Sequence, residues 1–250
     1  MEMMPVAPTA IERWALLRGS IAGEVIAPED AGYDQARLAW NLSVDQHPEV
    51  IVVPAQASDV LTAVQFASDH DLGVAVQATG HGVVRPADKA LLILTYAMDE
   101  VSVNPAARTA TIAAGAKWGK VLQMSHAYGL TPLLGSSPEV GAVGYTLGGG
   151  FGWLGRKFGL SLDSVNYFDV VTADGRAVTV SESEYPDLFW GMRGGGGSLA
   201  IVTGMEVKLY PVTTVYGGNL YYPIDQAQDV FKRYRTWIHS APEELTSSIL

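Results

Sequence analysis

The stretch that decides the fold is residues 74–82, which read VAVQATGHG. Its first half is a short apolar run typical of a β-strand. Its second half is a turn in which Gly80 and Gly82 flank His81. Glycines on both sides let the backbone adopt left-handed dihedrals and approach a bound group closely, and the N–H groups of such a turn can converge on an anion. On this stretch alone, a simple turn histidine is a more economical interpretation than a reactive one.

The residues before this stretch predict a strand–helix–strand unit that ends at the histidine turn. The apolar run at 50–53 is closed by Pro54 and is typical of a buried strand. We expect Ser58 to cap a helix that ends near Gly73. The apolar face of this helix is formed by Val60, Leu61, Val64 and Ala67. Further upstream, we expect a short helix that begins after Thr9, runs through Arg18 and stops at Gly19, followed by an irregular segment up to Trp40.

The residues after the turn predict a chain rich in short strands. We expect strands at 91–94, 101–103, 109–113, 165–172, 176–180, 199–209 and 215–222, and helices at 117–128, 185–192 and 225–239. Asp174 and Gly175 give a strong hairpin signal between two of these strands. The last helix carries a wide aromatic stripe with little sequence left to pack on, which indicates a missing partner or further chain. That stripe consists of Val230, Phe231, Tyr234, Trp237 and Ile238.

Composition limits the classes of protein that this chain can be. It has 250 residues, of which 48% are hydrophobic and 17% charged, enough for one large domain or two small ones. The formal net charge of −10 argues against a nucleic-acid partner. The absence of cysteine excludes disulfides, thiolate metal sites and any cofactor bond through sulfur. We find no signal peptide and no stretch long enough to span a membrane, which predicts a cytoplasmic protein with no membrane partner.

Several familiar motifs are poor matches. Residues 150–155 formally match the dinucleotide fingerprint, but the residues before them are Gly-rich rather than a strand, so we treat the match as chance. The five histidines show no i, i+4 pair, so we predict no metal site. The segment GSSPE at 135–139 lacks the last glycine of a nucleophile elbow.

Three Gly-rich segments remain, at 78–82, 141–152 and 194–197. The second lies in an aperiodic stretch at 132–155 that contains eight glycines, and we expect a functional loop there. Loops that expose their backbone in an acidic protein suit a large, flat, anionic ligand.

Six stretches that cover most of residues 46–211 carry a family resemblance. They read HPEVIVVPAQASDV, VAVQATGHG, VSVNPAARTATIAAGAKWGKVL, GSSPEVGAVGYTLGGGFGWLGRKFGLSLDSV, VVTADGRAV and LFWGMRGGGGSLAIVTGMEVKLYP. In this order they resemble the PCMH-type FAD-binding domain of the vanillyl-alcohol oxidase superfamily, close to its berberine-bridge-enzyme-like branch. The resemblance implies an α+β fold with two subdomains and FAD between them. It divides the chain into a lead-in at 1–45, the FAD-binding domain at 46–211 and the incomplete beginning of an α+β substrate-binding domain at 212–250.

The resemblance also implies the site residues. His81 matches the histidine that many relatives attach to the 8α carbon of the flavin, which makes it the expected single covalent link. Ser137 stands where some relatives have a second, cysteine tether, and Val140 matches a position where a small aliphatic residue leaves room for dioxygen. The full set of implied cofactor-binding residues is Gln77, Ala78, Thr79, Gly80, His81, Gly82, Ser137, Val140, Gly141, Gly144, Tyr145, Gly149, Gly150, Gly152 and Val202. At 77–79 and 198–200 the chain departs from the usual pattern, which puts individual flavin contacts in doubt.

The function implied is an FAD-dependent oxidoreductase, with an oxidase favoured. It would transfer a hydride from an alcohol- or amine-bearing carbon of a small molecule to flavin N5, with dioxygen as the acceptor. Relatives take their catalytic base from parts that follow this stretch, so no catalytic residue is named. Three alternatives stay open: a dehydrogenase of the same fold, a truncated flavin-binding module without turnover, and an NAD-binding domain.

Overall fold

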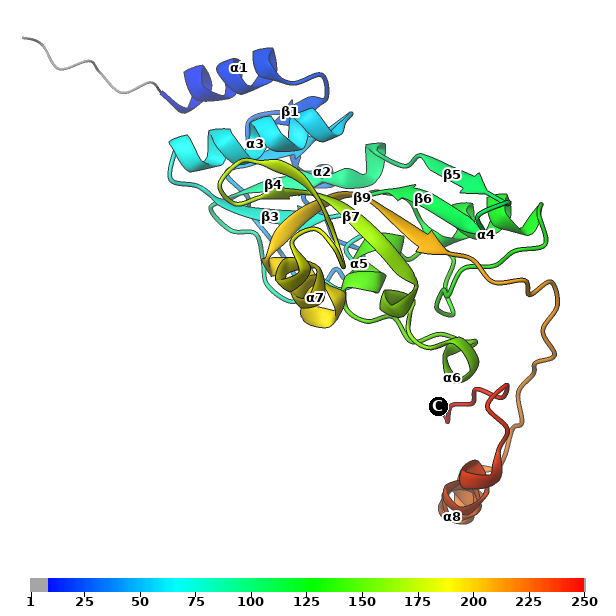
Figure 1. Cartoon of the computed structure of the whole chain (residues 1–250). Coiled ribbons are helices and arrows are strands. Elements are labelled where there is room, and N and C mark those ends of the chain that lie inside the picture. Colours follow the sequence, from blue (N-terminus) through cyan, green and yellow to red (C-terminus); the bar gives the residue numbers. More distant parts are fainter. Residues whose placement is uncertain (1–8, 250) are drawn as a thin grey trace, which may run out of the picture.

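Two β-sheets form the framework, and a computed structural model describes them over residues 9–249 (Figure 1). The first sheet is four-stranded, with the order β1-β2-β4-β3, and the second is five-stranded, with the order β5-β6-β9-β7-β8. The strands of the first sheet are β1 (Glu24–Ile26), β2 (Val50–Val53), β3 (Gly73–Gln77) and β4 (Ala90–Leu94). Those of the second are β5 (Val101–Asn104), β6 (Thr109–Ala113), β7 (Val165–Thr172), β8 (Ala177–Ser181) and β9 (Ala200–Lys208).

The first sheet is mixed because β2 and β3 both run parallel to β4, which lies between them. Parallel strands are covered on both faces and so consist of continuous apolar runs. Accordingly, all four residues of β2 are buried. The helix α3 (Ala57–Asp69) connects β2 to β3 and buries Val60, Ala63, Val64 and Ala67, at the spacing of one helical face. The expected strand–helix–strand unit is therefore present, and residues 78–82 follow directly after its last strand, β3.

The second sheet is antiparallel throughout. Helices α4 (Trp118–His126), α5 (Ala142–Leu147) and α7 (Pro186–Gly195) contribute buried side chains to its core. The predicted hairpin pairs β7 with β8, and the register places Val171 opposite Ala177. The two sheets are joined through the core of the first, because Val171 of β7 is buried there and Ile201 of β9 packs against it.

The N-terminal helix agrees with its sequence signals. Helix α1 (Ala10–Ser20) has Thr9 as its N-cap in a capping box with Glu12. It packs on α3, so that both helices lie on the same side of the first sheet (Figure 1). Among residues 9–249 no helix is both long and apolar enough to cross a membrane.

Five expectations about local structure were wrong. The segment up to Trp40 is not irregular, because it contains β1, which pairs antiparallel with β2, and the one-turn helix α2 (Tyr33–Ala36). Elements this short carry no periodic signal. Ser58 does not cap α3: the N-cap is Gln56, which makes no side-chain capping bond. That helix also ends at Asp69 rather than near Gly73, and residues 70–72 form a turn before β3.

The other two wrong expectations are a loop at 132–155 and a strand at 215–222. The Gly-rich stretch at 132–155 is not a continuous loop, because it contains α5 and the first residue of α6 (Gly155–Phe158). Residues 215–222 form no strand: they are exposed, and within residues 9–249 no strand pairs with them. Their apolar and aromatic residues, which suggested a strand, lie exposed instead.

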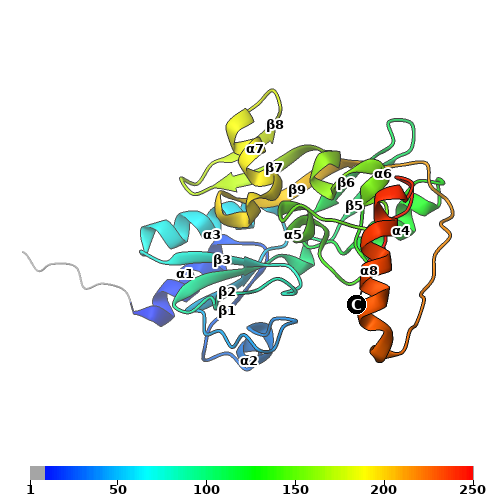
Figure 2. The same ribbon diagram turned by 90° about the horizontal axis from the view of Figure 1, so that it is seen from below.

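The last helix, α8 (Ala227–Trp237), stands apart from the two sheets on the side of α6, as the two views together show (Figures 1 and 2). It buries no residue, which agrees with the expectation that its aromatic stripe has little to pack on. The segment after α8 contacts α6: Arg156 donates a hydrogen bond to the carbonyl of Ala241 at 3.2 Å, and Lys157 lies 3.8 Å from Glu244.

Candidate functional site

A cavity of about 630 Å³ lies where the two sheets meet. The end of β3 and the turn after it form one wall, residues 140–148 form the second, and the start of β9 with Gly196 and Gly197 forms the third. Its volume falls within the range of small-molecule and cofactor sites. Because each wall comes from a different part of the chain, the site exists only when both sheets are in place.

Most of the predicted site residues lie in this cavity wall. They are Gln77, Ala78, Thr79, Gly80, His81, Gly82, Val140, Gly141, Gly144, Tyr145 and Val202. Ser137, Gly149, Gly150 and Gly152 are not part of the lining. The Ser137 hydroxyl instead accepts a hydrogen bond from the backbone N–H of Glu139 at 3.3 Å.

The His81 turn has the expected left-handed backbone at Gly80 but not at Gly82. Gly80 has φ +78°, in the left-handed region that favours glycine. A Cβ at this position would also lie 2.7 Å from the backbone nitrogen of Trp40. The imidazole of His81 is held by two contacts: its Nδ1 lies 2.8 Å from the Thr79 hydroxyl, and its ring stacks on that of Trp40 at a centroid distance of 4.4 Å.

The glycines of the site fall into two groups. At Gly82, Gly144, Gly196 and Gly197, which all line the cavity, an added Cβ would meet nothing within 4 Å. At Gly82, Gly144 and Gly197 packing within residues 9–249 does not require glycine, whereas Gly196 has φ +76°, in the left-handed region that favours glycine. At Gly150 and Gly152 a Cβ would come within 2.5 Å of the Tyr145 ring and 1.9 Å of the Leu134 carbonyl oxygen. These two glycines serve the packing of the loop, which explains why they lie outside the lining.

Tyr145 is the aromatic residue of the lining, and this packing holds it in place. Its ring lies 5.8 Å from that of Trp118, edge to face. Among the residues that the structure describes, its buried hydroxyl has no hydrogen-bond partner. Burial raises the pKa of the Tyr145 hydroxyl. The phenol therefore remains protonated at neutral pH and keeps a donor and an acceptor free.

Charge around the cavity is sparse. Arg85 is the one lysine or arginine among the lining residues, and it is exposed. Next to the cavity, Lys117 pairs with Glu139 at 2.7 Å. This hydrogen bond, the charge of Lys117 and a smaller effect of His81 hold the pKa of the Glu139 carboxyl below its ordinary value. An anionic ligand would therefore depend mainly on backbone N–H groups, as the acidic composition suggests.

Several lining residues were not in the predicted set. Gly196 and Gly197 belong to the Gly-rich segment 194–197, which the sequence marks as suited to a ligand, and Arg85 follows the histidine turn closely. Thr95, Ala114 and Leu147 carry no such signal: they reach the cavity through chain packing alone. These unpredicted lining residues are Val76, Val83, Val84, Arg85, Thr95, Ala114, Val143, Leu147, Gly148, Gly196, Gly197, Ala200 and Ile201.

Known proteins resemble this chain in sequence. Residues 48–181 match the family model described as FAD binding domain. The chain is 33% identical over 236 residues to an uncharacterised FAD-linked oxidoreductase of Bacillus subtilis, covering 92% of this chain and 52% of that protein. It is 35% identical over 193 residues to (R)-6-hydroxynicotine oxidase of Paenarthrobacter nicotinovorans, covering 76% of this chain and 42% of that protein.

A solved structure extends the likeness to the fold. Glucooligosaccharide oxidase from Acremonium strictum, described with a 6-S-cysteinyl, 8α-N1-histidyl FAD, superposes with a TM-score of 0.72 at 33% identity. The match covers 78% of this chain and 42% of that one. The predicted α+β FAD-binding fold is thus confirmed, and the chain spans about half the length of the relatives it matches.

Proposed function

Because the chain belongs to the family of FAD binding domains of PCMH-type FAD-linked oxidoreductases, we propose that it is the FAD-binding part of an oxidase. FAD would lie in the cavity between the two sheets and supply the hydride-accepting chemistry at flavin N5. The substrate would be a small molecule with an alcohol- or amine-bearing carbon, and dioxygen would be the final acceptor. The observation that carries this proposal is the glycine-lined cavity beside His81.

The residues present fit this cofactor. Gly82, Gly144, Gly196 and Gly197 expose their backbone to open cavity space, as a flat ring system and a diphosphate require. The unpartnered hydroxyl of Tyr145 is a buried polar group at the same cavity, and such groups normally have a partner. A polar ligand would provide it.

His81 would carry the single covalent link. Its imidazole lines the cavity, and the chain has no cysteine that could form a second tether. A histidyl bond is described for the FAD of glucooligosaccharide oxidase, which supports the same role here. The neutral imidazole would provide the nitrogen that bonds to the flavin 8α carbon.

The relatives that this chain matches are about twice as long, which supports a second domain in the proposed enzyme. Residues 212–250 would begin a substrate-binding domain, whose remainder would supply the base that deprotonates the substrate. The position of α8 apart from the two sheets, with no buried residue of its own, supports this division (Figures 1 and 2). Two functions compete with this proposal: a dehydrogenase of the same fold, and a flavin-binding module without turnover.

The oxidase assignment can be tested without knowing the substrate. Protein loaded with FAD is photoreduced under anaerobic conditions and mixed with air-saturated buffer while the flavin absorbance and hydrogen peroxide are followed. We expect rapid reoxidation with stoichiometric peroxide in the wild type. The larger side chain in Val140→Leu should slow reoxidation about tenfold or more, because Val140 lines the cavity and would leave less room for dioxygen.

The outcomes separate the competing functions. Slow reoxidation by dioxygen in the wild type, together with fast reoxidation by an artificial acceptor, would assign a dehydrogenase. Failure of the protein to take up FAD would contradict the whole proposal. A Val140→Leu variant as fast as the wild type would remove Val140 from the path of dioxygen while leaving the oxidase assignment in place.

Arg85 is expected to strengthen FAD binding by a small amount. Its guanidinium is exposed, and an exposed ion pair with the diphosphate contributes about 0.5–1 kcal/mol, or roughly a two- to fivefold change in Kd. We expect Arg85→Gln to weaken FAD binding by this factor at low salt and by less at high salt. Flavin fluorescence titration in a His81→Ala background, where no covalent bond forms at that residue, measures Kd. The exposed Arg233 of α8 provides the control Arg233→Gln, and equal effects of the two variants would contradict a specific role for Arg85.

A further inference from the structure

The imidazole of His81 is fixed in two independent directions. The ring of Trp40 stacks on it at 4.4 Å with an angle of 14° between the planes, which restricts the tilt of the imidazole. The Thr79 hydroxyl lies 2.8 Å from Nδ1, which restricts rotation within the plane. Together the two contacts hold the ring that lines the cavity in one orientation.

Hydrogen bonds between two segments that are distant in the sequence place Trp40 over His81. The side chain of Gln77 donates to the carbonyl of Leu38 at 3.0 Å. The N–H of Trp40 donates to the Thr79 carbonyl at 3.3 Å, and the N–H of Asn41 donates to the Gly80 carbonyl at 3.4 Å. Residues 38–41 therefore run alongside residues 77–80. The lack of a Cβ at Gly80 allows this approach, because such an atom would lie 2.8 Å from the Cα of Ala39.

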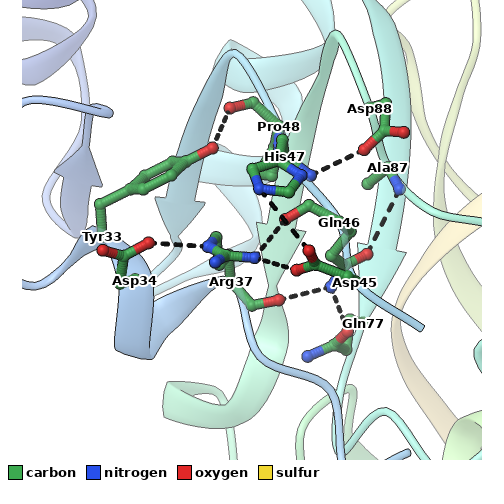
Figure 3. A network of polar contacts seen from close by, with 10 residues as sticks. All are labelled: Tyr33, Asp34, Arg37, Asp45, Gln46, His47, Pro48, Gln77, Ala87 and Asp88. Carbon is green, nitrogen blue, oxygen red and sulfur yellow. Dashed lines mark hydrogen bonds and ion pairs between the residues drawn. The ribbon is translucent and has the colours of Figure 1, made fainter. Parts of the chain in front are cut away.

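A polar network joins the two ends of residues 37–46, the segment that contains Trp40 (Figure 3). The side-chain amide of Gln46 donates to the Arg37 carbonyl at 2.7 Å and to the Gln77 side chain at 3.0 Å. Arg37 also forms ion pairs with Asp34 and Asp45. Both Gln46 and Gln77 are buried. Trp40 itself is 67% exposed, so burial of its own surface explains little of this arrangement.

We propose that Trp40 and Thr79 are positioning residues that hold the His81 imidazole for covalent attachment of FAD, an inference that rests on the proposed function. Attachment requires the imidazole nitrogen to meet one carbon of the bound cofactor at bonding geometry, and a side chain held in one orientation loses less freedom in doing so. Trp40 lies in the lead-in segment, outside the residues that the sequence associates with the site.

Covalent attachment joins the imidazole to the flavin and oxidises the 8α carbon by two electrons. One C–H bond at the flavin 8α carbon and one N–H bond of the neutral imidazole are replaced by an N–C bond, and two protons are released to solvent. The electron pair of the former C–H bond remains on the flavin, which is reduced. Dioxygen is the oxidant that takes up this pair and is reduced to hydrogen peroxide.

The experiment follows attachment over time after FAD is added to flavin-free protein. Samples are precipitated with acid, the flavin in the pellet is quantified by fluorescence, and peptide mass spectrometry locates it. We expect Trp40→Ala and Thr79→Val to attach FAD on the order of tenfold more slowly than the wild type, because the reacting nitrogen is less well positioned. Trp40→Phe and Thr79→Ser keep the ring and the hydroxyl, and we expect rates within about twofold of the wild type.

Two readouts separate positioning from general damage. Total FAD bound after one hour and the thermal unfolding midpoint should be the same in Trp40→Ala and Trp40→Phe, which lie outside the cavity wall, as in the wild type. The control Trp190→Ala removes another exposed tryptophan, 76% exposed on α7 and outside the cavity wall, and should attach FAD at the wild-type rate.

Each outcome decides one part of the proposal. Attachment at the wild-type rate in Trp40→Ala and Thr79→Val would overturn the positioning role and leave the proposed function in place. Wild-type protein that binds FAD only reversibly would overturn this inference and the covalent link, but not FAD binding. Wild-type protein that takes up no FAD would overturn the proposed function itself.

Discussion

Replacement of His81 with alanine is expected to convert a yellow protein whose flavin stays in the acid pellet into one whose flavin passes entirely into the supernatant. The chain contains no cysteine, and His81 is the one histidine among the predicted site residues. The variant should still bind FAD, because most of the cavity wall is formed by backbone and by apolar side chains that the substitution leaves unchanged. His81→Ala should therefore abolish the covalent bond and weaken FAD binding only slightly.

The visible spectrum before and after acid precipitation measures this result. Loss of the electron-withdrawing histidyl bond should also lower the redox potential of the bound flavin, which a dye-equilibration titration detects. The control is His126→Ala, because His126 is exposed at the end of α4 and outside the cavity wall. Acid-stable flavin in His81→Ala would assign the link to another residue. Flavin released from both the wild type and the variant would reduce His81 to a contact of the loop.

The framework of the fold could be predicted because its longer elements have strong local signals. The apolar run at 50–53, the spacing of Val60 and Val64, and the Asp174-Gly175 turn each point to one structure, and the chain adopts it. By contrast, β1 has three residues, and its strand is defined by pairing with β2 rather than by its own composition. The reverse error occurs at 215–222, where a strand-like pattern has no sheet edge beside it.

The site was predictable where the backbone itself forms it and less so where distant residues meet. Gly80, Gly149 and Gly150 are visible in the sequence because their left-handed dihedrals and close approach demand glycine. Nothing in the sequence distinguishes Gly144, which faces the cavity, from Gly152, which packs against Leu134. Likewise, no local pattern relates Trp40 to His81. Their contact depends on the ladder between residues 38–41 and 77–80, which only the fold creates.

Asp59→Ala is expected to cause the largest loss of stability of any single side-chain truncation proposed here. Asp59 lies in the first turn of α3 and is only 2% exposed. Its carboxylate accepts hydrogen bonds from three backbone N–H groups, those of Ala22 and Gly23 at 3.0 Å and of Ala55 at 2.9 Å. Each of these donors would lose its partner, at about 1–3 kcal/mol per buried group that stays unsatisfied. Water can reach part of this site, so we expect a total of about 3–5 kcal/mol.

This loss would be a large share of the roughly 5–15 kcal/mol that stabilises a typical domain. Urea denaturation followed by circular dichroism measures the free energy of unfolding. Asp59→Asn keeps one acceptor oxygen but directs an amide towards the remaining donors, so its loss should be intermediate. The control is Asp69→Ala at the exposed C-terminal end of the same helix, which we expect to change the free energy of unfolding by less than about 0.5 kcal/mol.

The position of Asp59 connects this loss of stability to the site. Its carboxylate ties the chain just before β1 to the chain just after β2, where a Cβ on Gly23 would lie 2.1 Å from the Val53 carbonyl oxygen. The same N-terminal segment continues from β1 to Trp40 and its contact with His81. Asp59→Ala should therefore also slow FAD attachment, at a site that the carboxylate does not touch. An Asp59→Ala variant that unfolds like the wild type would show that water replaces the carboxylate. Attachment at an unchanged rate in a destabilised variant would show that the Trp40 segment is held by its own network.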